Sequence, residues 1–341
     1  MPVIVNAKAP HPFLPSLGDP AAIEAELARH QDIRPLEVAI INLMADKVAT
    51  ERQLAKWLGN TMLQVNLTFA ATDDYVHGIH TGRETRNTPA DHIKDFYSAW
   101  SDIKDRAFDG LIVTGVNALQ PTVEGEAIWP EVRQILDWSA ANVFSSLYLC
   151  WGAKAALKHF HDIDSFRAAQ KLFGLFDHHL VSDETGLLAG FPDNFAVPVS
   201  RWKSPRREDI LKHLELEIVA DSDEAGPNIL VESALHEKNG IPYPRRAYVL
   251  NHPEYETDTL KREYERDHGN NPNVPLPKHY FPDDNPKLTP RNTWRHTAHV
   301  YTNWITAVYE ATPYDIAEIA PARNMRQLRD LDHQEMNGGQ T

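Results

Sequence analysis

The sequence has one cysteine among 341 residues, so it can form no internal disulfide bond and no cysteine-rich zinc site. It also lacks any apolar run near the roughly 20 residues that a helix needs to cross a bilayer. The first residues, MPVIVNAKAPHPFLPSL, show neither a basic stretch followed by an apolar one nor an arginine-rich amphipathic pattern. We therefore expect a protein of a reducing compartment, the cytoplasm, with no membrane attachment.

Positive charge is also scarce. Asp and Glu number 48 against 34 Lys and Arg, which gives a net charge of -14, and the acids are scattered along the chain. This balance disfavours nucleic acid as a partner and gives no general attraction for an anionic cofactor. With 42% hydrophobic and 24% charged residues, the composition is that of a globular protein with one large core or two smaller ones.

Apolar runs of strand length alternate with stretches of helical periodicity. This order is typical of an α/β fold with a mostly parallel sheet flanked by helices. The clearest predicted strands are Leu36–Leu43, Leu63–Phe69, Leu111–Thr114, Ser145–Leu149 and Arg246–Leu250. A weaker pair, Leu216–Ala220 and Asn228–Val231, predicts a small antiparallel addition.

The predicted helices are Thr50–Leu58, Ile128–Trp138 and Trp294–Tyr309. Thr50 is the predicted N-cap of the first. Proline recurs too often in Asn270–Arg291 for a helix or an interior strand, so this segment should be an ordered surface excursion or lid. We expect one domain at residues 36–318, an N-terminal extension at 1–35 and a frayed tail at 319–341.

The single cysteine, Cys150, lies between a predicted strand, SSLYL, and a helical pattern, WGAKAALKHF. A thiol on such a strand-to-helix elbow faces the positive end of the helix dipole and unpaired backbone N–H groups, which favour a thiolate and can hold an oxyanion. Gly152 permits the close approach that such elbows need. The alternative is a small packing residue, because free cysteine is among the most buried residue types. On the elbow alone the two interpretations carry equal weight.

A histidine and a glutamate follow a second predicted strand, in the run NHPEYE after AYVL. In an open α/β sheet the carboxyl ends of strands border one crevice, so His252 could meet Cys150 there. Glu254 could then hold the imidazole tautomer, as the third group of a nucleophile triad does. Taken alone, the H-x-E run is more often a turn with a surface histidine. Together with the cysteine elbow it favours a triad.

Further polar residues admit more than one interpretation. The adjacent His178 and His179 point in different directions on a helix or a strand, so they are poorly placed to share a metal ion. We predict a structural role for both, and no metal ion in the site. The runs KREYERDH and SRWKSPRR are either solvated faces or sources of cations for an amino-acid carboxylate or coenzyme phosphates.

The chain resembles the homoserine O-acyltransferase family in segments that occur in the same order. These are INLMADKVATERQL, ETRNTPADHIKDFY, FDGLIVTG, YLCWGAKAAL, NHPEYETDTL and NTWRHTAHVYTNWITAVYEATPYDI. The resemblance runs from about Leu36 to about Ile316. It implies a flavodoxin-like fold similar to the class I glutamine amidotransferases. It also implies acyl transfer from a co-substrate, acetyl-CoA or succinyl-CoA, with no bound cofactor.

Motif by motif, the resemblance places the acyl-thioester nucleophile at Cys150, the general base at His252 and its orienting carboxylate at Glu254. The backbone N–H of Trp151, with one from the Thr114–Val116 turn, would stabilise the oxyanion. The reaction implied is ping-pong: the thiolate takes the acyl group, and His252 then deprotonates the acceptor hydroxyl that attacks the thioester. The product is an O-acyl amino acid, a precursor in methionine biosynthesis.

The resemblance also implies residues that bind the small-molecule substrates. It places substrate-binding residues at Lys171, Ser200 and Arg266, the last for the amino-acid carboxylate. Lys47 and Glu263 match further family positions and are candidate substrate-binding residues. No nucleic acid or membrane partner is implied, and the family suggests a homodimer.

Two departures from the family pattern lie in stretches expected to line the substrate pocket. Leu119 stands where the family has the Gly or Glu that selects the acyl donor, and Val199 replaces the histidine before Ser200. An apolar Leu119 offers no partner for a second carboxylate, so we expect acetyl-CoA rather than succinyl-CoA. L-homoserine is the expected acceptor. L-serine is a rival because one methylene is worth only about 1 to 3 kcal/mol of discrimination.

Two other functions stay open. A glutamine amidotransferase or related hydrolase would use the same three residues on water or ammonia, although Tyr148 stands where those enzymes usually have glycine. A binding or regulatory protein that kept the fold without activity is disfavoured, because Cys150, His252 and Glu254 are all present.

Overall fold

The computed structural model describes residues 3–5, 22–24, 34–235, 240, 242–271 and 274–319. Twelve strands in these residues form one sheet, in the order β2-β1-β4-β3-β6-β7-β12-β11-β10-β8-β9, with β5 paired to β4. The strands are β1 (Val3–Val5), β2 (Ala22–Glu24), β3 (Leu36–Ile41), β4 (Val65–Ala71), β5 (Ser98–Ala99), β6 (Phe108–Val113), β7 (Val143–Leu149), β8 (Ser165–Leu180), β9 (Asn194–Pro205), β10 (Glu217–Asp221), β11 (Ile229–Leu235) and β12 (Pro242–Val249).

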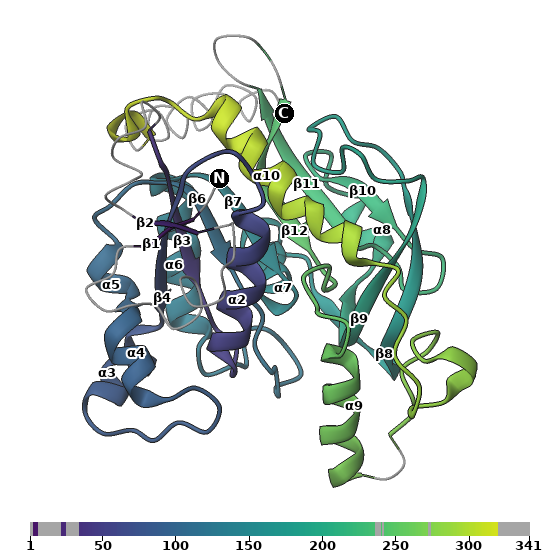
Figure 1. Cartoon of the computed structure of the whole chain (residues 1–341). Coiled ribbons are helices and arrows are strands. Elements are labelled where there is room, and N and C mark those ends of the chain that lie inside the picture. Colours follow the sequence, from purple (N-terminus) through teal and green to yellow (C-terminus); the bar gives the residue numbers. More distant parts are fainter. Residues whose placement is uncertain are drawn as a thin grey trace, which may run out of the picture.

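Helices lie on both faces of the sheet (Figure 1). They are α2 (Lys47–Leu58), α3 (Asp73–His80), α4 (Ala90–Phe96), α5 (Trp100–Ile103), α6 (Trp129–Asn142), α7 (Trp151–His161), α8 (Arg207–Ile210), α9 (Thr259–Asn270) and α10 (His299–Ala311), with the 3-10 turns η1 (Pro282–Asp284), η2 (Arg295–Ala298) and η3 (Ile316–Glu318). Within the described part of the chain, no helix combines the length and apolar character that a membrane crossing requires.

The sheet has a parallel part and an antiparallel part. From β2 to β12 neighbouring strands are parallel, and from β12 onward β11, β10, β8 and β9 are each antiparallel to their neighbour. The predicted mostly parallel α/β sheet with antiparallel additions is therefore confirmed. The predicted pair at 216–220 and 228–231 corresponds to β10 and β11.

An apolar layer lies on each face of the sheet, between the strands and the helices that cover them. Along β3, Val38 and Ile40 face one layer, whereas Ala39 and Ile41 face the other. Helices α2 and α10 cover the first layer, and α6 and α7 cover the second (Figure 1). Because both faces are covered, the central strands are continuous apolar runs, which is why they could be predicted from the sequence.

Helix boundaries differ from the predictions in one instructive place. Helix α2 begins at Lys47, and its N-cap is Asp46, whose carboxylate accepts the N–H of Ala49. The prediction of Thr50 as N-cap was wrong, because the Thr50 hydroxyl donates to the Asp46 carbonyl inside the helix. Predicted helices at 128–138 and 294–309 correspond to α6 and to η2 followed by α10.

A long hairpin, β8 and β9, was not predicted. β8 is polar and half exposed along its first half and carries an irregularity between Arg167 and Leu172, so it lacks strict alternation. The proline-rich segment packs against this hairpin, as Tyr280 and Phe281 cluster with Phe173. As predicted, the described part of 270–291 has no strand; its helical residues are the end of α9 and the short turn η1.

Gly152 lies in the first turn of α7, where the helix passes against the end of β6. An added Cβ would lie 2.6 Å from the Val113 carbonyl oxygen and 2.8 Å from that of Thr114. We expect Gly152→Ala to lower the free energy of unfolding in urea by about 1 to 3 kcal/mol, the usual cost of overpacking. Gly269→Ala in α9 is the control, because that glycine has open space around it. Equal loss of stability in both variants would contradict the close contact.

Candidate active site

Cys150 occupies the predicted elbow between β7 and α7. It is the N-cap of α7, with φ 50° and ψ -109°. A positive φ costs a residue other than glycine about 1 to 3 kcal/mol, so neighbouring contacts must hold it. Its N–H donates to the Val249 carbonyl at 2.7 Å, and its own carbonyl accepts from the Lys154 N–H at 3.2 Å. The thiol is thereby fixed at the carboxyl edge of the parallel strands.

The turn after β6 lies directly beside the thiol. A Cβ added to Gly115 would be 3.2 Å from the Cys150 Cβ and 3.6 Å from its Sγ, so a larger residue at this position would crowd the cysteine. The same point is 3.5 Å from the Trp151 nitrogen. Since a first-turn N–H has no carbonyl partner within its own helix, Trp151 can offer its N–H to an atom bonded to the sulfur.

His252 and Glu254 follow β12, the strand next to β7. The two strands are parallel, with Leu149 opposite Val249, so their carboxyl ends lie side by side. His252 Nδ1 is 2.8 Å from Glu254 Oε1. A carboxylate at this distance accepts a hydrogen bond from Nδ1–H, which leaves Nε2 for other chemistry. The structure therefore brings the three predicted catalytic residues together.

Two tyrosines support the histidine and the glutamate. The Tyr301 hydroxyl of α10 donates to Glu254 Oε2 at 2.8 Å. The Tyr255 ring stacks on the His252 imidazole, with centroids 4.2 Å apart and planes at 18°. Both are buried, so the imidazole has a fixed plane and the carboxylate a fixed orientation.

Positive charges surround the thiol. Burial raises the pKa of Cys150, but the charges of His252 and Lys154, with a hydrogen bond from His252, lower it to about 6. Burial lowers the pKa of His252, yet the opposite charges of Cys150 and Glu254 raise it to about 10. At neutral pH the pair is therefore a thiolate and an imidazolium.

A third buried cation, Arg201 on β9, also acts on the thiol. Its charge lowers the pKa of Cys150 further. The two Nη atoms donate to neutral oxygens, the side chain of Asn251 and the Ala225 carbonyl, and Nε has no partner. His178 accepts from the Asn251 amide at 3.0 Å while its Nδ1 donates to the Phe176 carbonyl at 2.8 Å. Burial lowers the pKa of His178 to about 4, so it serves here as a neutral hydrogen-bond partner.

The predicted substrate-binding residues form a polar cluster beside the triad. Ser200 Oγ on β9 donates to Glu263 Oε2 at 2.5 Å, and the Tyr255 hydroxyl donates to Glu263 Oε1 at 2.7 Å. Lys171 Nζ on β8 lies 3.4 Å from Asp267 Oδ2 and 3.9 Å from Glu263 Oε2. Tyr255 thus links His252 to a cluster of Ser200, Glu263 and Lys171.

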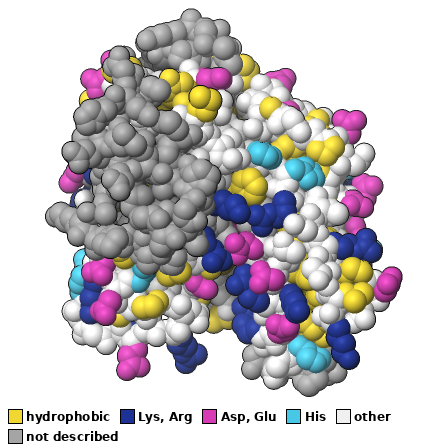
Figure 2. Space-filling view, in the orientation of Figure 1, with side chains coloured by type: hydrophobic (Ala, Val, Ile, Leu, Met, Phe, Trp, Pro, Cys, Tyr) yellow, Lys and Arg dark blue, Asp and Glu magenta, His cyan; other side chains and the backbone are white. Residues whose placement is uncertain are grey.

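Arg266 lies at the edge of this cluster. It extends from α9, pairs with Asp267 at 2.8 Å and keeps 65% of its side chain exposed. Figure 2 shows basic and acidic side chains mixed over the part of this face where α9 lies. Arg266 is therefore accessible to a ligand that enters from solvent.

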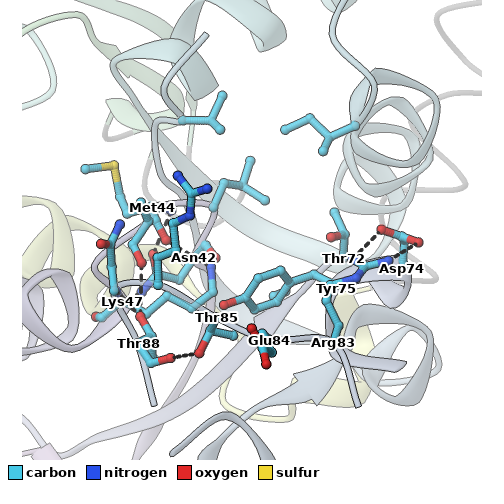
Figure 3. Close-up of a pocket in the computed structure, with 17 residues that line it drawn as sticks. Asn42, Met44, Lys47, Thr72, Asp74, Tyr75, Arg83, Glu84, Thr85 and Thr88 are labelled. Carbon is cyan, nitrogen blue, oxygen red and sulfur yellow. Dashed lines mark hydrogen bonds and ion pairs between the residues drawn. The ribbon is translucent and has the colours of Figure 1, made fainter. Parts of the chain in front are cut away.

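Lys47 lies in a pocket at the carboxyl ends of β3 and β4. The cavity, of about 370 Å³, reaches Val116 in the turn beside the thiol. Lys47 Nζ donates to the carbonyls of Asn42 and Met44, and burial lowers its pKa to about 7. The Lys47 ammonium lies 4.4 Å from the centroid of the Tyr75 ring, and both residues line the pocket drawn in Figure 3.

The two departures from the family pattern have different surroundings. Leu119 has 79% of its surface exposed, so in this structure it neither lines a buried pocket nor excludes a carboxylate from one. The expectation drawn from Leu119 about the acyl donor has no buried contact behind it. Val199 is fully buried and packs with Phe176 and Ala225.

Four more residues of the candidate site were not predicted from the sequence: Lys154, Arg201, Tyr255 and Tyr301. Lys154 was within reach of inference, because residues four apart share a helix face and it follows Cys150 by four. Tyr255 is adjacent to Glu254 in the chain. Tyr301 lies 47 residues after Glu254 in another element, and no local pattern marks it.

Fold and site together define an α/β protein with a Cys–His–Glu triad at the carboxyl edge of two parallel strands. The profile of the family described as "Homoserine O-succinyltransferase" matches residues 2–314. The chain belongs to this family of acyltransferases, and the resemblance seen in its motifs is confirmed.

Relatives with assigned names cover nearly the whole chain. A "Homoserine O-acetyltransferase" of Rhizobium leguminosarum bv. trifolii is 42% identical over 86% of this chain and 90% of its own length. One of Novosphingobium aromaticivorans is 43% identical over 87% of this chain and 91% of its own length. One of Desulfitobacterium hafniense is 39% identical over 94% of this chain and 99% of its own length.

Similar solved structures are more distant. A glutamine amidotransferase from Methylobacillus flagellatus has 10% identity and a TM-score of 0.48 over 81% of this chain and 96% of its own. One from Thermotoga maritima has 12% identity and a TM-score of 0.44 over 81% and 97%.

The lowered pKa of Cys150 predicts its reactivity. Because the thiolate is the nucleophile, the rate of alkylation by iodoacetamide should stay high down to about pH 6 and fall below it. Lys154→Met removes a cation that favours the thiolate, so we expect the midpoint to move to higher pH by about one unit, equivalent to about 1.4 kcal/mol.

Lys158→Met is the matched control on the same helix, because Lys158 is paired with Asp162 and Asp164. It should leave the midpoint unchanged. Identical midpoints for the wild type and Lys154→Met would show that Lys154 does not act on the thiol.

Proposed function

We propose that the protein transfers an acetyl group from acetyl-CoA to the hydroxyl of L-homoserine through a thioester on Cys150. The observation that carries the proposal is the partly buried thiol beside His252, with Glu254 fixed behind the imidazole, in a member of an acyltransferase family. The relatives' assigned name, homoserine O-acetyltransferase, supports acetyl as the donor group.

The first half of the reaction forms the thioester. The Cys150 thiolate attacks the acyl carbon of acetyl-CoA, and the carbonyl oxygen becomes an oxyanion. The N–H of Trp151 and one N–H of the Thr114–Val116 turn stabilise this charge, and Lys154 adds a cation nearby. The carbon–sulfur bond to coenzyme A then breaks, and CoA leaves as a thiol after taking the proton from His252 Nε2.

The second half transfers the acyl group to the acceptor. His252 Nε2, now neutral, takes the proton of the homoserine hydroxyl as the oxygen attacks the thioester carbon. Glu254 stabilises the imidazolium that forms, and Tyr301 keeps Glu254 in place. The bond to sulfur breaks, Cys150 returns as a thiolate, and O-acetylhomoserine leaves. In this sequence the imidazolium–thiolate pair is the resting state.

The acceptor amino acid binds in the polar cluster beside His252. Glu263 and Asp267 offer carboxylates to the substrate ammonium group, and Lys171 and Arg266 offer cations to its carboxylate. The cluster is connected to His252 through Tyr255, and this connection supports binding of the acceptor on the base side of the thioester.

The donor approaches from the other side of the thiol. The pocket that holds Lys47 borders the turn beside Cys150 and has room for the chain that carries the acetyl group. Lys47 is a candidate donor for a hydrogen bond to that chain.

A donor-by-acceptor matrix tests the function. Purified protein is assayed with acetyl-CoA or succinyl-CoA against L-homoserine or L-serine, with glutamine and water as further acceptors. We expect acetyl-CoA and L-homoserine to give the highest kcat/KM. Cys150→Ser should lose about a thousandfold or more in rate, because no thiolate remains.

The acyl-enzyme is the second readout of the same experiment. Acetyl-CoA without an acceptor should add one acetyl group to the wild type, on Cys150, and none to Cys150→Ser. Faster turnover of succinyl-CoA would overturn the acetyl assignment, and faster turnover of L-serine would overturn homoserine. Glutaminase activity without acyl-CoA, or no acyl-enzyme at all, would overturn acyl transfer.

Arg266 provides a separate test of acceptor binding. If its guanidinium binds the amino-acid carboxylate, Arg266→Lys should raise the KM for homoserine by about tenfold and leave the KM for acetyl-CoA unchanged, because a lysine cannot form the bidentate pair. Steady-state kinetics with each substrate varied in turn give the two values.

Arg262→Lys is the matched control one helical turn earlier. Arg262 pairs with Asp258 at 3.3 Å and Glu256 at 3.6 Å, so its substitution should change neither KM. A rise in the KM for acetyl-CoA in Arg266→Lys would instead assign Arg266 to the donor.

A further inference from the structure

A histidine, a second histidine and a glutamate converge at the end of α7 opposite to Cys150. His161 is the last residue of α7, and His213 and Glu215 lie in the turn between α8 and β10. Each offers one ligand atom, and the three atoms lie within 4.8 Å of one another. None of the three takes part in the acyl-transfer mechanism.

The spacing of these atoms matches that of a metal-ligand set. His161 Nδ1 is 3.1 Å and His213 Nδ1 is 3.3 Å from the same oxygen, Glu215 Oε1. In a tetrahedral zinc site with bonds of about 2.0 to 2.2 Å, neighbouring ligand atoms are about 3.3 to 3.6 Å apart. An ion at the centre of the three atoms therefore requires only small side-chain shifts.

The far side of the His161 ring is already fixed. Its Nε2 is 3.0 Å from the Tyr248 hydroxyl and 3.5 Å from Glu232 Oε2. Glu232 in turn accepts from Arg246 at 2.6 Å. Metal-bound histidines usually make such a contact through the second ring nitrogen, because it fixes the tautomer and leaves the other nitrogen's lone pair for the metal. His161 is thus oriented with Nδ1 toward Glu215.

The cluster combines one rigid ligand with two accessible ones. The His161 side chain is 5% exposed, whereas those of His213 and Glu215 are 29% and 52% exposed. An ion can therefore enter from solvent, and a water molecule can take the fourth position. The eleven residues of α7 separate this cluster from the thiol by about 16 Å at a rise of about 1.5 Å per residue.

We propose that His161, His213 and Glu215 form a binding site for a divalent transition-metal ion of the zinc type, separate from the acyl-transfer site. Two imidazoles and one carboxylate are ligands that such ions prefer. The ion would join the end of α7 to the turn before β10, which Glu215 already links to His161 by a hydrogen bond. Its role is therefore structural, and acyl transfer needs no ion at this place.

Binding is tested in the Cys150→Ser protein, because the wild-type thiolate beside His252 could itself hold zinc. After dialysis against a chelator, zinc is added and its binding is measured by competition with a chromophoric chelator and by native mass spectrometry. We expect one ion per chain, bound at micromolar or lower concentration, and a higher melting temperature with zinc than without it.

Two variants in the Cys150→Ser background locate the ion. His213→Ala should weaken binding by about 100-fold or more and abolish the rise in melting temperature. His80→Ala, at an exposed histidine in α3, should bind like the parent. The melting temperatures without metal show whether each variant is folded.

Two results would overturn the proposal. One is absence of bound zinc in folded Cys150→Ser protein, which would show that the cluster is only two histidines hydrogen-bonded to Glu215. The other is equal binding by His213→Ala and the parent, which would place the ion elsewhere. Both results are independent of acyl-transfer activity, so the function proposed above can stand or fall separately.

Discussion

The charge pair between Cys150 and His252 determines how the rest of the site must be built. Burying an unpaired charge costs several kcal/mol, so a buried thiolate needs cations close to it. Three cations, Lys154, Arg201 and His252, face two anions, the thiolate and Glu254. The surplus of positive charge suits a reaction in which a further negative charge appears on the acyl oxygen. The positive charge that would stabilise the oxyanion is thus already present before the reaction begins.

The sheet supplies the geometry that this pair requires. Cys150 and His252 follow adjacent parallel strands in fixed register. The backbone N–H of Cys150 donates to the Val249 carbonyl and that of His252 to the Pro198 carbonyl, so both residues are bound to other strands. Close contacts at Gly115 and Gly152 complete the elbow. Because these contacts are made by backbone, the distance between thiol and imidazole depends little on side-chain flexibility.

The sequence predicted the parts of this arrangement that have a local signature. Strands buried on both faces appear as apolar runs, an elbow appears as a cysteine between strand and helix, and the base appears as a polar run after a strand. The hairpin of β8 and β9 could not be predicted, since its half-exposed, irregular first strand has no clear period. Tyr301 and Arg201 were missed as parts of the catalytic site because long-range packing, not local sequence, brings them to it. Asp46, and not Thr50, is the N-cap of α2, because its carboxylate accepts the free N–H of Ala49 in the first turn.

Residues of the candidate site that are synthesised before α10 depend on contacts with that helix. The Tyr301 hydroxyl of α10 donates to Glu254, and the Trp304 indole donates to Ser145 in β7 at 2.8 Å. Helix α10 therefore stabilises residues that precede it in the chain. A nascent chain that stops short of α10 already contains the thiol, the imidazole and the carboxylate, yet the carboxylate has no hydroxyl to hold it. The proposed catalytic arrangement would then be complete only after α10 docks. Until then the hydrogen bond that orients Glu254 behind His252 is missing.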